Sequence, residues 1–204
     1  MTAGQRFARF VTNVVVRAPG LWRLFRRPLT ANFDRIAPEW DANRVDETRL
    51  RPIVAAFEAI DVPPRAVLDL GTGTGRVARL AADRWPGAAI TGVDVSSGMI
   101  AEARRLATSE EQRYEVGDAS RLPYPDGAFD LVALNNMIPF FDEVARVTAA
   151  GGHVAIAYGM GSSTPIWVPL DRVRGELERR GFTHVANFSA GPGVSLLARK
   201  ADAS

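Results

Sequence analysis

The stretch Val-Leu-Asp-Leu-Gly-Thr-Gly-Thr-Gly at residues 67–75 decides the fold of this chain. The apolar run at 66–70 is bounded by glycines, which is typical of a buried strand, and the residues from Arg76 onward predict a helix. The three glycines therefore occupy the turn between a strand and a helix. Because glycine has no side chain, a ligand can lie directly against the backbone of such a turn.

An acidic residue follows near the end of the next predicted strand. This strand covers residues 89–95 and carries Asp94. A carboxylate in this position, beside a glycine turn, can accept hydrogen bonds from both hydroxyls of a ribose. The turn and Asp94 together predict a site for a nucleoside.

The glycine spacing and a second acidic residue argue against a dinucleotide. A dinucleotide site has the pattern G-x-G-x-x-G, which lets the N-terminus of the helix face a pyrophosphate. Here the pattern is G-x-G-x-G, and Arg76 stands in the place of the third glycine. Asp69 lies inside the first strand, where its negative charge disfavours a pyrophosphate but favours a ligand with an amino group.

This combination resembles motif I of the class I S-adenosylmethionine-dependent methyltransferases. In that family the acidic residue of the strand, here Asp69, helps to hold the methionine amino group of S-adenosylmethionine. The second acidic residue, here Asp94, holds the ribose. The segment Val-Gly-Asp-Ala at 116–119 looks like the one that frames the adenine in these enzymes.

The resemblance continues toward the C-terminus. Residues 122–132 are similar to the loop-and-strand signature of the small-molecule, type 11-like branch, and residues 141–154 are similar to its next helix and strand. The likeness covers about residues 33–199 and implies a Rossmann-like three-layer sandwich around a seven-stranded sheet. We also predict a helix over residues 46–60 and strands over 112–116 and 152–158. The alternation of predicted strands and helices independently indicates an α/β fold with a mostly parallel sheet, and a C-terminal hairpin indicates one antiparallel strand.

Length and composition predict one domain. A chain of 204 residues is long enough for a full core, and 47% hydrophobic with 24% charged residues is typical of a soluble protein, so we expect a cytoplasmic location. We divide the domain into an N-terminal arm, 1–45, and a core, 46–204. The absence of cysteine excludes disulfides and thiolate sites, and we expect no metal. The net charge of +2 is too small to indicate a nucleic-acid partner.

The N-terminal arm has the most uneven charge. Residues 1–33 contain six arginines and no acidic residue, interleaved with large apolar residues. The apolar run at 10–16 is far shorter than the ~20 residues of a membrane span. We predict two helices separated at Pro19-Gly20 that pack on their own domain or on a second copy. A substrate lid and a peripheral contact with a membrane surface are the alternatives.

Ligands of such a sheet bind at the carboxyl ends of the strands, where the strand order reverses. Thr72 either contacts the cofactor or caps the turn, Met99 either covers the adenine or fills the core, and Asn135 either contacts the cofactor or belongs to a turn. Trp40 lies in the segment 33–41, which resembles the lid motif of the family. The expected cofactor-binding residues are Asp69, Gly71, Thr72, Gly73, Gly75, Asp94, Val95, Met99, Asp118, Ala119, Asn135 and Trp40.

The reaction implied by the resemblance needs little from the protein. The methyl group on a sulfonium is already activated, so the enzyme mainly aligns an acceptor and excludes water. A general base is useful only for a hydroxyl or a carbon acid, and we identify no catalytic residue. We expect O- or C-methylation of a small, partly apolar molecule rather than N-methylation. The alternatives are a cofactor-binding but inactive partner subunit and a nucleotide-linked oxidoreductase.

Overall fold

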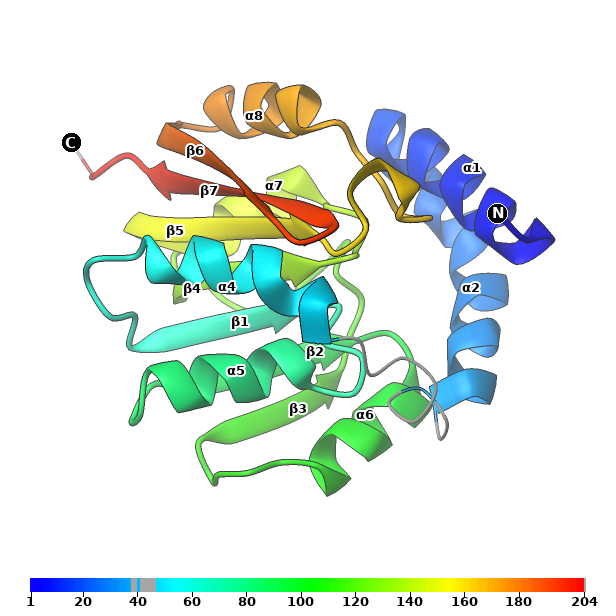
Figure 1. Cartoon of the computed structure of the whole chain (residues 1–204), viewed down its shortest axis with the longest axis horizontal. Coiled ribbons are helices and arrows are strands. Elements are labelled where there is room, and N and C mark those ends of the chain that lie inside the picture. Colours follow the sequence, from blue (N-terminus) through cyan, green and yellow to red (C-terminus); the bar gives the residue numbers. More distant parts are fainter. Residues whose placement is uncertain (38–39, 41–46, 204) are drawn as a thin grey trace.

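A seven-stranded sheet forms the centre of the molecule (Figure 1). The computed structural model describes residues 1–37, 40 and 47–203. The strands are β1 (Ala66–Leu70), β2 (Ala89–Asp94), β3 (Gln112–Val116), β4 (Phe129–Asn135), β5 (Thr148–Tyr158), β6 (Phe182–Ala190) and β7 (Gly193–Lys200). In the order β3-β2-β1-β4-β5-β7-β6, neighbours are parallel from β3 to β5, and β7 is antiparallel to both β5 and β6. The predicted mostly parallel sheet with one antiparallel strand is confirmed.

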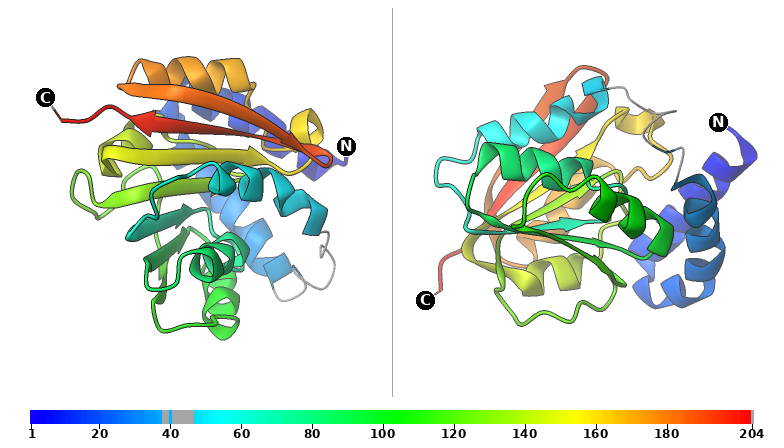
Figure 2. Two further views of the ribbon diagram at one scale, coloured as in Figure 1. Left: turned by 60° about the vertical axis from the view of Figure 1, so that its left-hand side comes forward. Right: turned by 90° about the horizontal axis from the view of Figure 1, so that it is seen from below.

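Helices cover both faces of the sheet and complete the predicted three layers (Figure 2). The first face carries α4 (Arg51–Glu58), α5 (Arg76–Arg84) and α6 (Ser97–Arg105), and the second carries α7 (Phe141–Val147) and α8 (Leu170–Glu178). Each face has its own buried apolar cluster. Ile53 and Ile100 belong to the cluster on the first face, and Val144 and Val173 belong to the cluster on the second.

The register of the central strands aligns their carboxyl ends. Leu70, the last residue of β1, pairs with Val93 of β2 and with Leu134 of β4. The side chains of β1 are buried on both faces, as expected for a central parallel strand. The residues that follow these three positions therefore reach one edge of the sheet: Gly71, Asp94 and Asn135.

The described part of the arm lies along this edge (Figure 1). It consists of α1 (Ala3–Arg17), a 3-10 turn η1 (Pro19–Leu21) and α2 (Trp22–Ile36), so the predicted break at Pro19-Gly20 is confirmed. Val15 and Leu29, from the inner sides of the two helices, are buried in the same cluster as the second face of the sheet. The guanidinium of Arg9 donates hydrogen bonds to three carbonyl groups of the segment 162–165, which follows β5. The arm thus packs on its own core.

Two element boundaries differ from the sequence prediction for identifiable reasons. Before α4 the described chain forms a 3-10 turn, η3 (Glu47–Leu50), and the α-helix starts only at Arg51. Pro52 lies in the first turn of α4, where its missing N–H costs no hydrogen bond. Strand β5 begins at Thr148, four residues before the predicted Gly152, because Thr148 pairs with Phe129 ahead of a register shift in β4.

Several predicted features fall partly outside the described residues. These are Pro38, Glu39 and Asp41 of the lid motif, the boundary between arm and core at 45–46, and Asp46 at the start of the helix predicted for 46–60. Among the helices of residues 1–37 and 47–203, none is long and apolar enough to cross a membrane.

The buried side of α1 leads to the first prediction. Val15 is fully buried, so Val15→Ala is expected to lower the free energy of unfolding by about 1–3 kcal/mol through the cavity it leaves. Urea denaturation measures this change. Val62→Ala, at an exposed position before β1, is the matched control and should change the free energy by less than about 0.5 kcal/mol. Equal effects of the two substitutions would show that α1 does not unfold together with the core.

Candidate functional site

The glycine turn between β1 and α5 has a backbone that favours glycine at three positions. Gly71, Gly73 and Gly75 have φ values of 74°, 55° and 83°. A Cβ atom at Gly71 would lie 2.5 Å from Cγ of Met137, and one at Gly75 would lie 2.7 Å from the Tyr114 hydroxyl. Around a Cβ atom at Gly73, in contrast, no atom of the other described residues lies within 4 Å, apart from the two chain neighbours. Gly73 is therefore the point at which a ligand can approach the turn.

Asp94 at the end of β2 is bonded to this turn. Its Oδ2 accepts a hydrogen bond from the backbone N–H of Gly73 at 3.0 Å, and its Oδ1 accepts one from the N–H of Ser96 at 2.9 Å. Burial raises the pKa of Asp94, while the backbone donors act in the opposite direction. An ionised carboxylate has about four acceptor positions, so acceptor capacity remains for a ligand.

Asp69 supports the turn from inside the sheet. Its side chain is 1% exposed, and Oδ2 accepts hydrogen bonds from the Thr72 hydroxyl at 2.5 Å and from the N–H of Ala78 at 3.0 Å. Burial raises the pKa of Asp69 to about 7, and the bonds from Thr72 and Ala78 oppose this rise. The Thr72 hydroxyl thus ties the turn to the buried carboxylate of β1.

The carboxylate of Asp118 connects the core to the arm. Its Oδ1 accepts from the indole N–H of Trp22 at 2.9 Å, and its Oδ2 accepts from Arg26 at 2.8 Å. The backbone and hydroxyl of Ser120 also donate to Oδ1. Burial acts to raise the pKa of Asp118, but the hydrogen bonds from Arg26, Ser120 and Trp22 hold it below the usual value.

A second carboxylate connects the arm to α6. Asp34, near the end of α2, accepts hydrogen bonds from the Ser96 hydroxyl at 2.6 Å and from the N–H of Gly98 at 3.0 Å. Helix α2 is therefore bonded to the core near both of its ends. Sequence reasoning missed Trp22, Arg26 and Asp34, because such side-chain pairs between distant segments produce no periodic pattern.

A hollow of about 340 Å³ lies between these two connections. Val95, which follows Asp94, lines it from the core, and the other lining residues come from α2. The lining residues on the helix are Arg26, Arg27, Thr30, Ala31 and Asp34. The structure thus brings Val95, Asp94 and Asp118 to one side of the glycine turn, under α2.

The remaining predicted residues differ in their surroundings. Met99 and Ala119 are buried, with exposed fractions of 1% and 8%. Asn135 lies at the end of β4, and its side-chain Oδ1 is buried without a hydrogen-bond partner in the part of the chain that the structure describes. The ring of Trp40 meets the ring of Phe33 edge-on, with centroids 5.9 Å apart. A buried acceptor without a partner, such as that of Asn135, fits a ligand that donates N–H groups.

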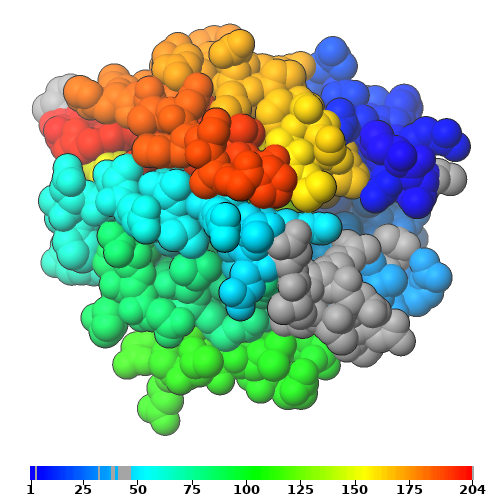
Figure 3. Space-filling view, viewed as in Figure 1, coloured from blue at the N-terminus to red at the C-terminus, as the bar shows by residue number. Residues whose placement is uncertain are grey.

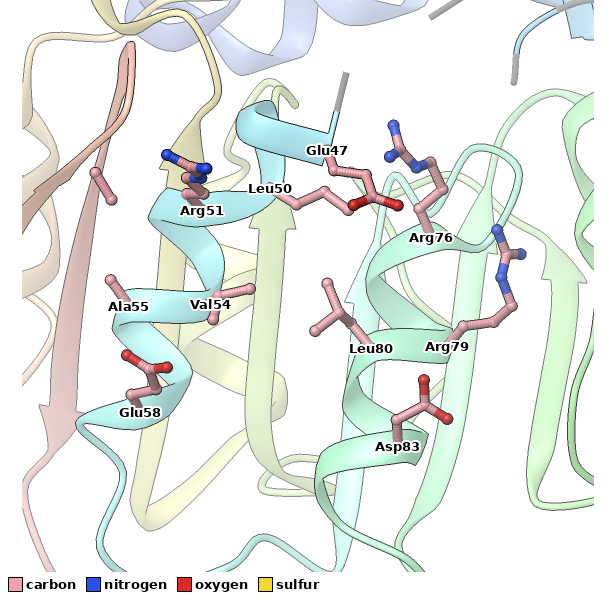
Figure 4. Close-up of a pocket in the computed structure, with 11 residues that line it drawn as sticks. Glu47, Leu50, Arg51, Val54, Ala55, Glu58, Arg76, Arg79, Leu80 and Asp83 are labelled. Carbon is pink, nitrogen blue, oxygen red and sulfur yellow. The ribbon is translucent and has the colours of Figure 1, made fainter. Parts of the chain in front are cut away.

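A larger hollow lies elsewhere. It measures about 620 Å³ and separates α4 from α5 (Figure 4). Its rim carries charges of both signs, with Glu58 on α4, Arg76 and Asp83 on α5, and Glu47 on η3. None of the twelve predicted cofactor residues lines it. We place the candidate site at the glycine turn, because there buried polar groups converge from β1, β2 and β4.

The buried carboxyl of Asp69 leads to the second prediction. Its pKa is about 7 in the folded chain, compared with 3.8 for an exposed aspartate, so between these values the folded state binds the proton more tightly than the unfolded state. Ionisation of Asp69 therefore lowers the free energy of unfolding as the pH rises from about 4 to 7. Asp69→Asn, which keeps an acceptor oxygen, should reduce this decline.

Urea denaturation of both proteins at pH 5 and pH 7 measures the difference in slope. Asp83→Asn on the exposed side of α5 is the control and should leave the pH dependence of the parent unchanged. An equal decline in the parent and in Asp69→Asn would contradict the raised pKa.

Comparisons with known proteins identify the family. A family model described as a methyltransferase domain matches residues 67–152. The malonyl-[acyl-carrier protein] O-methyltransferase of Geobacter sulfurreducens is 34% identical over an alignment that covers 80% of this chain and 73% of that protein. The demethylmenaquinone methyltransferase of Thermus thermophilus is 37% identical over 61% of this chain and 62% of that protein. The chain thus matches only part of the length of each relative.

A solved structure shows the same fold. Human N-acetylserotonin methyltransferase in complex with S-adenosylmethionine superposes with a TM-score of 0.64 at 17% identity, covering 84% of this chain and 56% of that chain. These comparisons leave no support for the oxidoreductase alternative. The glycine turn, the sheet order and the relatives agree, and the chain belongs to the class I S-adenosylmethionine-dependent methyltransferase family.

Proposed function

We propose that this chain binds S-adenosylmethionine across the carboxyl edge of its sheet and transfers the methyl group to a small, partly apolar molecule. The observation that carries the proposal is the bond between Gly73 and Asp94. It holds the open part of the glycine turn and a carboxylate with free acceptor positions side by side. A nucleoside needs both, because its ribose hydroxyls donate hydrogen bonds while its sugar lies close to the backbone.

Each part of the cofactor has a matching group in the proposed site. Asp94 accepts hydrogen bonds from the ribose hydroxyls. The unpaired Oδ1 of Asn135 and the charge of Asp69 favour the amino group of the methionine part, beside the turn formed by residues 71–75. The adenine lies in the hollow under α2, which the core residue Val95 lines. Met99, Asp118 and Ala119 complete its surroundings from the core, and Trp40 covers the cofactor from the arm.

The chemistry asks mainly for position and for exclusion of water. The cofactor supplies an electrophilic methyl group that leaves its sulfonium as the acceptor forms the new bond, so the protein need not activate the carbon. The bonds from α2 to Asp118 and from Asp34 to Ser96 keep the arm over the edge of the sheet. This cover excludes water from the site, which is the contribution we assign to the arm.

The acceptor is proposed to react through oxygen or carbon. The two relatives described above are named for an O-methylation and for methylation of demethylmenaquinone. Neither histidine is placed to act as a base at the site. His153 pairs with Leu131 in the middle of the sheet, and His184 lies on the outermost strand β6. The proton of the acceptor must therefore be acidic enough to leave without a histidine base, or it must be removed by a base that is not among the residues named here.

The role of Asp94 leads to the third prediction. Asp94→Ala should weaken S-adenosylmethionine binding by about 1.5–3 kcal/mol, roughly 10- to 150-fold in Kd, because it removes a charged acceptor. Asp94→Asn, which keeps one acceptor oxygen, should lose less. Isothermal titration calorimetry measures both, with the exposed Asp61→Ala as control. If folded Asp94→Ala binds like the parent, the proposed placement of the ribose is wrong.

Catalysis itself is the subject of the fourth prediction. Incubation of the purified chain with methyl-labelled S-adenosylmethionine and a metabolite extract should transfer label to products that partition into organic solvent. The same reaction with candidate partner proteins tests the alternative of an inactive subunit. Label transfer only in the presence of a partner, by a chain that binds the cofactor alone, would overturn the enzymatic proposal and favour that alternative.

A further inference from the structure

The outer side of the arm carries large apolar side chains that its own domain does not cover. Phe10 and Leu24 are the most exposed of them, at 56% and 70%. The ring of Phe25 contacts the ring of Phe7 at 6.4 Å and that of Phe10 at 6.2 Å, so the side chains of α1 and α2 form one continuous surface. We call this surface the outer apolar patch and define it by Phe7, Phe10, Leu21, Leu24 and Phe25.

This patch is not a consequence of poor packing of the arm. The opposite sides of the same helices are buried in the core, with Val11 and Val15 on α1 and Trp22 and Leu29 on α2. The two helices are thus apolar on both sides. Large apolar side chains that stay exposed together on a surface are typical of a docking site for a partner or a membrane.

The charge around the patch is of one sign. Residues 1–33 contain no acidic residue, and five of the six arginines in this segment are exposed: Arg6, Arg17, Arg23, Arg26 and Arg27. Arg26 and Arg27 line the hollow under α2, whereas Arg6, Arg17 and Arg23 do not. Only Arg26 forms an ion pair within the described chain, with Asp118. The surface that the patch contacts must therefore tolerate or attract positive charge.

An anionic lipid surface meets both requirements, and a second copy of this chain does not. In a symmetric dimer through the patch, the arginines of one copy would face those of the other. Aromatic and leucine side chains enter the boundary between headgroups and acyl chains, and each arginine near an anionic leaflet adds to the attraction. We propose that the outer apolar patch docks the chain on an anionic membrane surface.

Docking in this way sets the orientation of the whole molecule. The arm lies along the carboxyl edge of the sheet, and its N-terminal residues form one side of the surface in the space-filling view (Figure 3). Because α2 is bonded to Asp118 and Ser96 at this edge, the lipid surface would face the same edge as the candidate site. The inference concerns a different surface from the cofactor site and does not depend on the proposed methyl transfer.

Vesicle sedimentation with the full chain tests the proposal. The parent should bind vesicles of phosphatidylcholine mixed with phosphatidylglycerol, bind phosphatidylcholine vesicles far more weakly, and lose affinity as salt is added. The double variant Phe10→Ser/Leu24→Ser should lose about tenfold or more in vesicle affinity through the lost apolar contacts. Arg6→Glu/Arg23→Glu should lose a similar factor on the anionic vesicles and little on the neutral ones.

Matched controls lie on other parts of the surface. Val62→Ser exchanges an exposed apolar residue before β1, and Arg113→Glu exchanges an exposed arginine of β3, and both should bind vesicles like the parent. Circular dichroism and S-adenosylmethionine titration confirm that all variants remain folded. Equal binding to both vesicle types, no binding to either, or a parent dimer that Phe10→Ser/Leu24→Ser dissociates in analytical ultracentrifugation would overturn the proposal.

Discussion

The hydrogen bonds of the buried Asp69 carboxylate hold together the elements on which the candidate site depends. One oxygen accepts from the Thr72 side chain in the turn and from the backbone of Ala78 in α5, so β1, the turn and the helix are fixed to one another. Asp94 then binds the turn from the neighbouring strand through Gly73. Two carboxylates on adjacent strands thus set the shape of the loop before any ligand binds. Part of the cost of burying them is offset by the backbone donors that they satisfy.

The arm extends this arrangement across the edge of the sheet. Its bonds use Asp118, which the family resemblance assigns to the adenine, and Ser96, which caps α6. The same residues therefore serve the core, the arm and the proposed cofactor site. Any displacement of α2 changes the surroundings of Asp118, and any ligand that engages Asp118 competes with Trp22 and Arg26 for its oxygens. If the cofactor contacts Asp118 as proposed, its binding and the position of the arm are coupled through this carboxylate.

The sequence predicted the core more completely than the connections between segments. The bounds of β1 agree with the prediction because a short, mostly apolar run ends there at a glycine. The bounds of β3 agree as well, although this strand is largely polar. The start of β5 was missed, since a register shift in β4 leaves no mark in the pattern of side chains. The groups around the turn could be predicted from motif I, whereas the bonds of Trp22, Arg26 and Asp34 could not. These three side chains meet partners more than sixty residues away, and only the folded chain brings them together.

The short connections after β4 and β5 explain why we assign both the cover of the site and the outer apolar patch to the arm. Asn136 has a left-handed backbone with φ of 56°, and its side chain accepts from the N–H of Gly159, so the two strand ends are tied directly to each other. Connections fixed in this way do not extend over the edge of the sheet, and the cover must come from another part of the chain. Arg9 attaches α1 to the segment after β5, and α2 closes the other side. The helices that we propose to exclude water from the site are consequently the ones that present apolar surface outward. If the acceptor dissolves in lipid, docking through the outer apolar patch places the membrane that holds the acceptor on the same side of the molecule as the entry to the site.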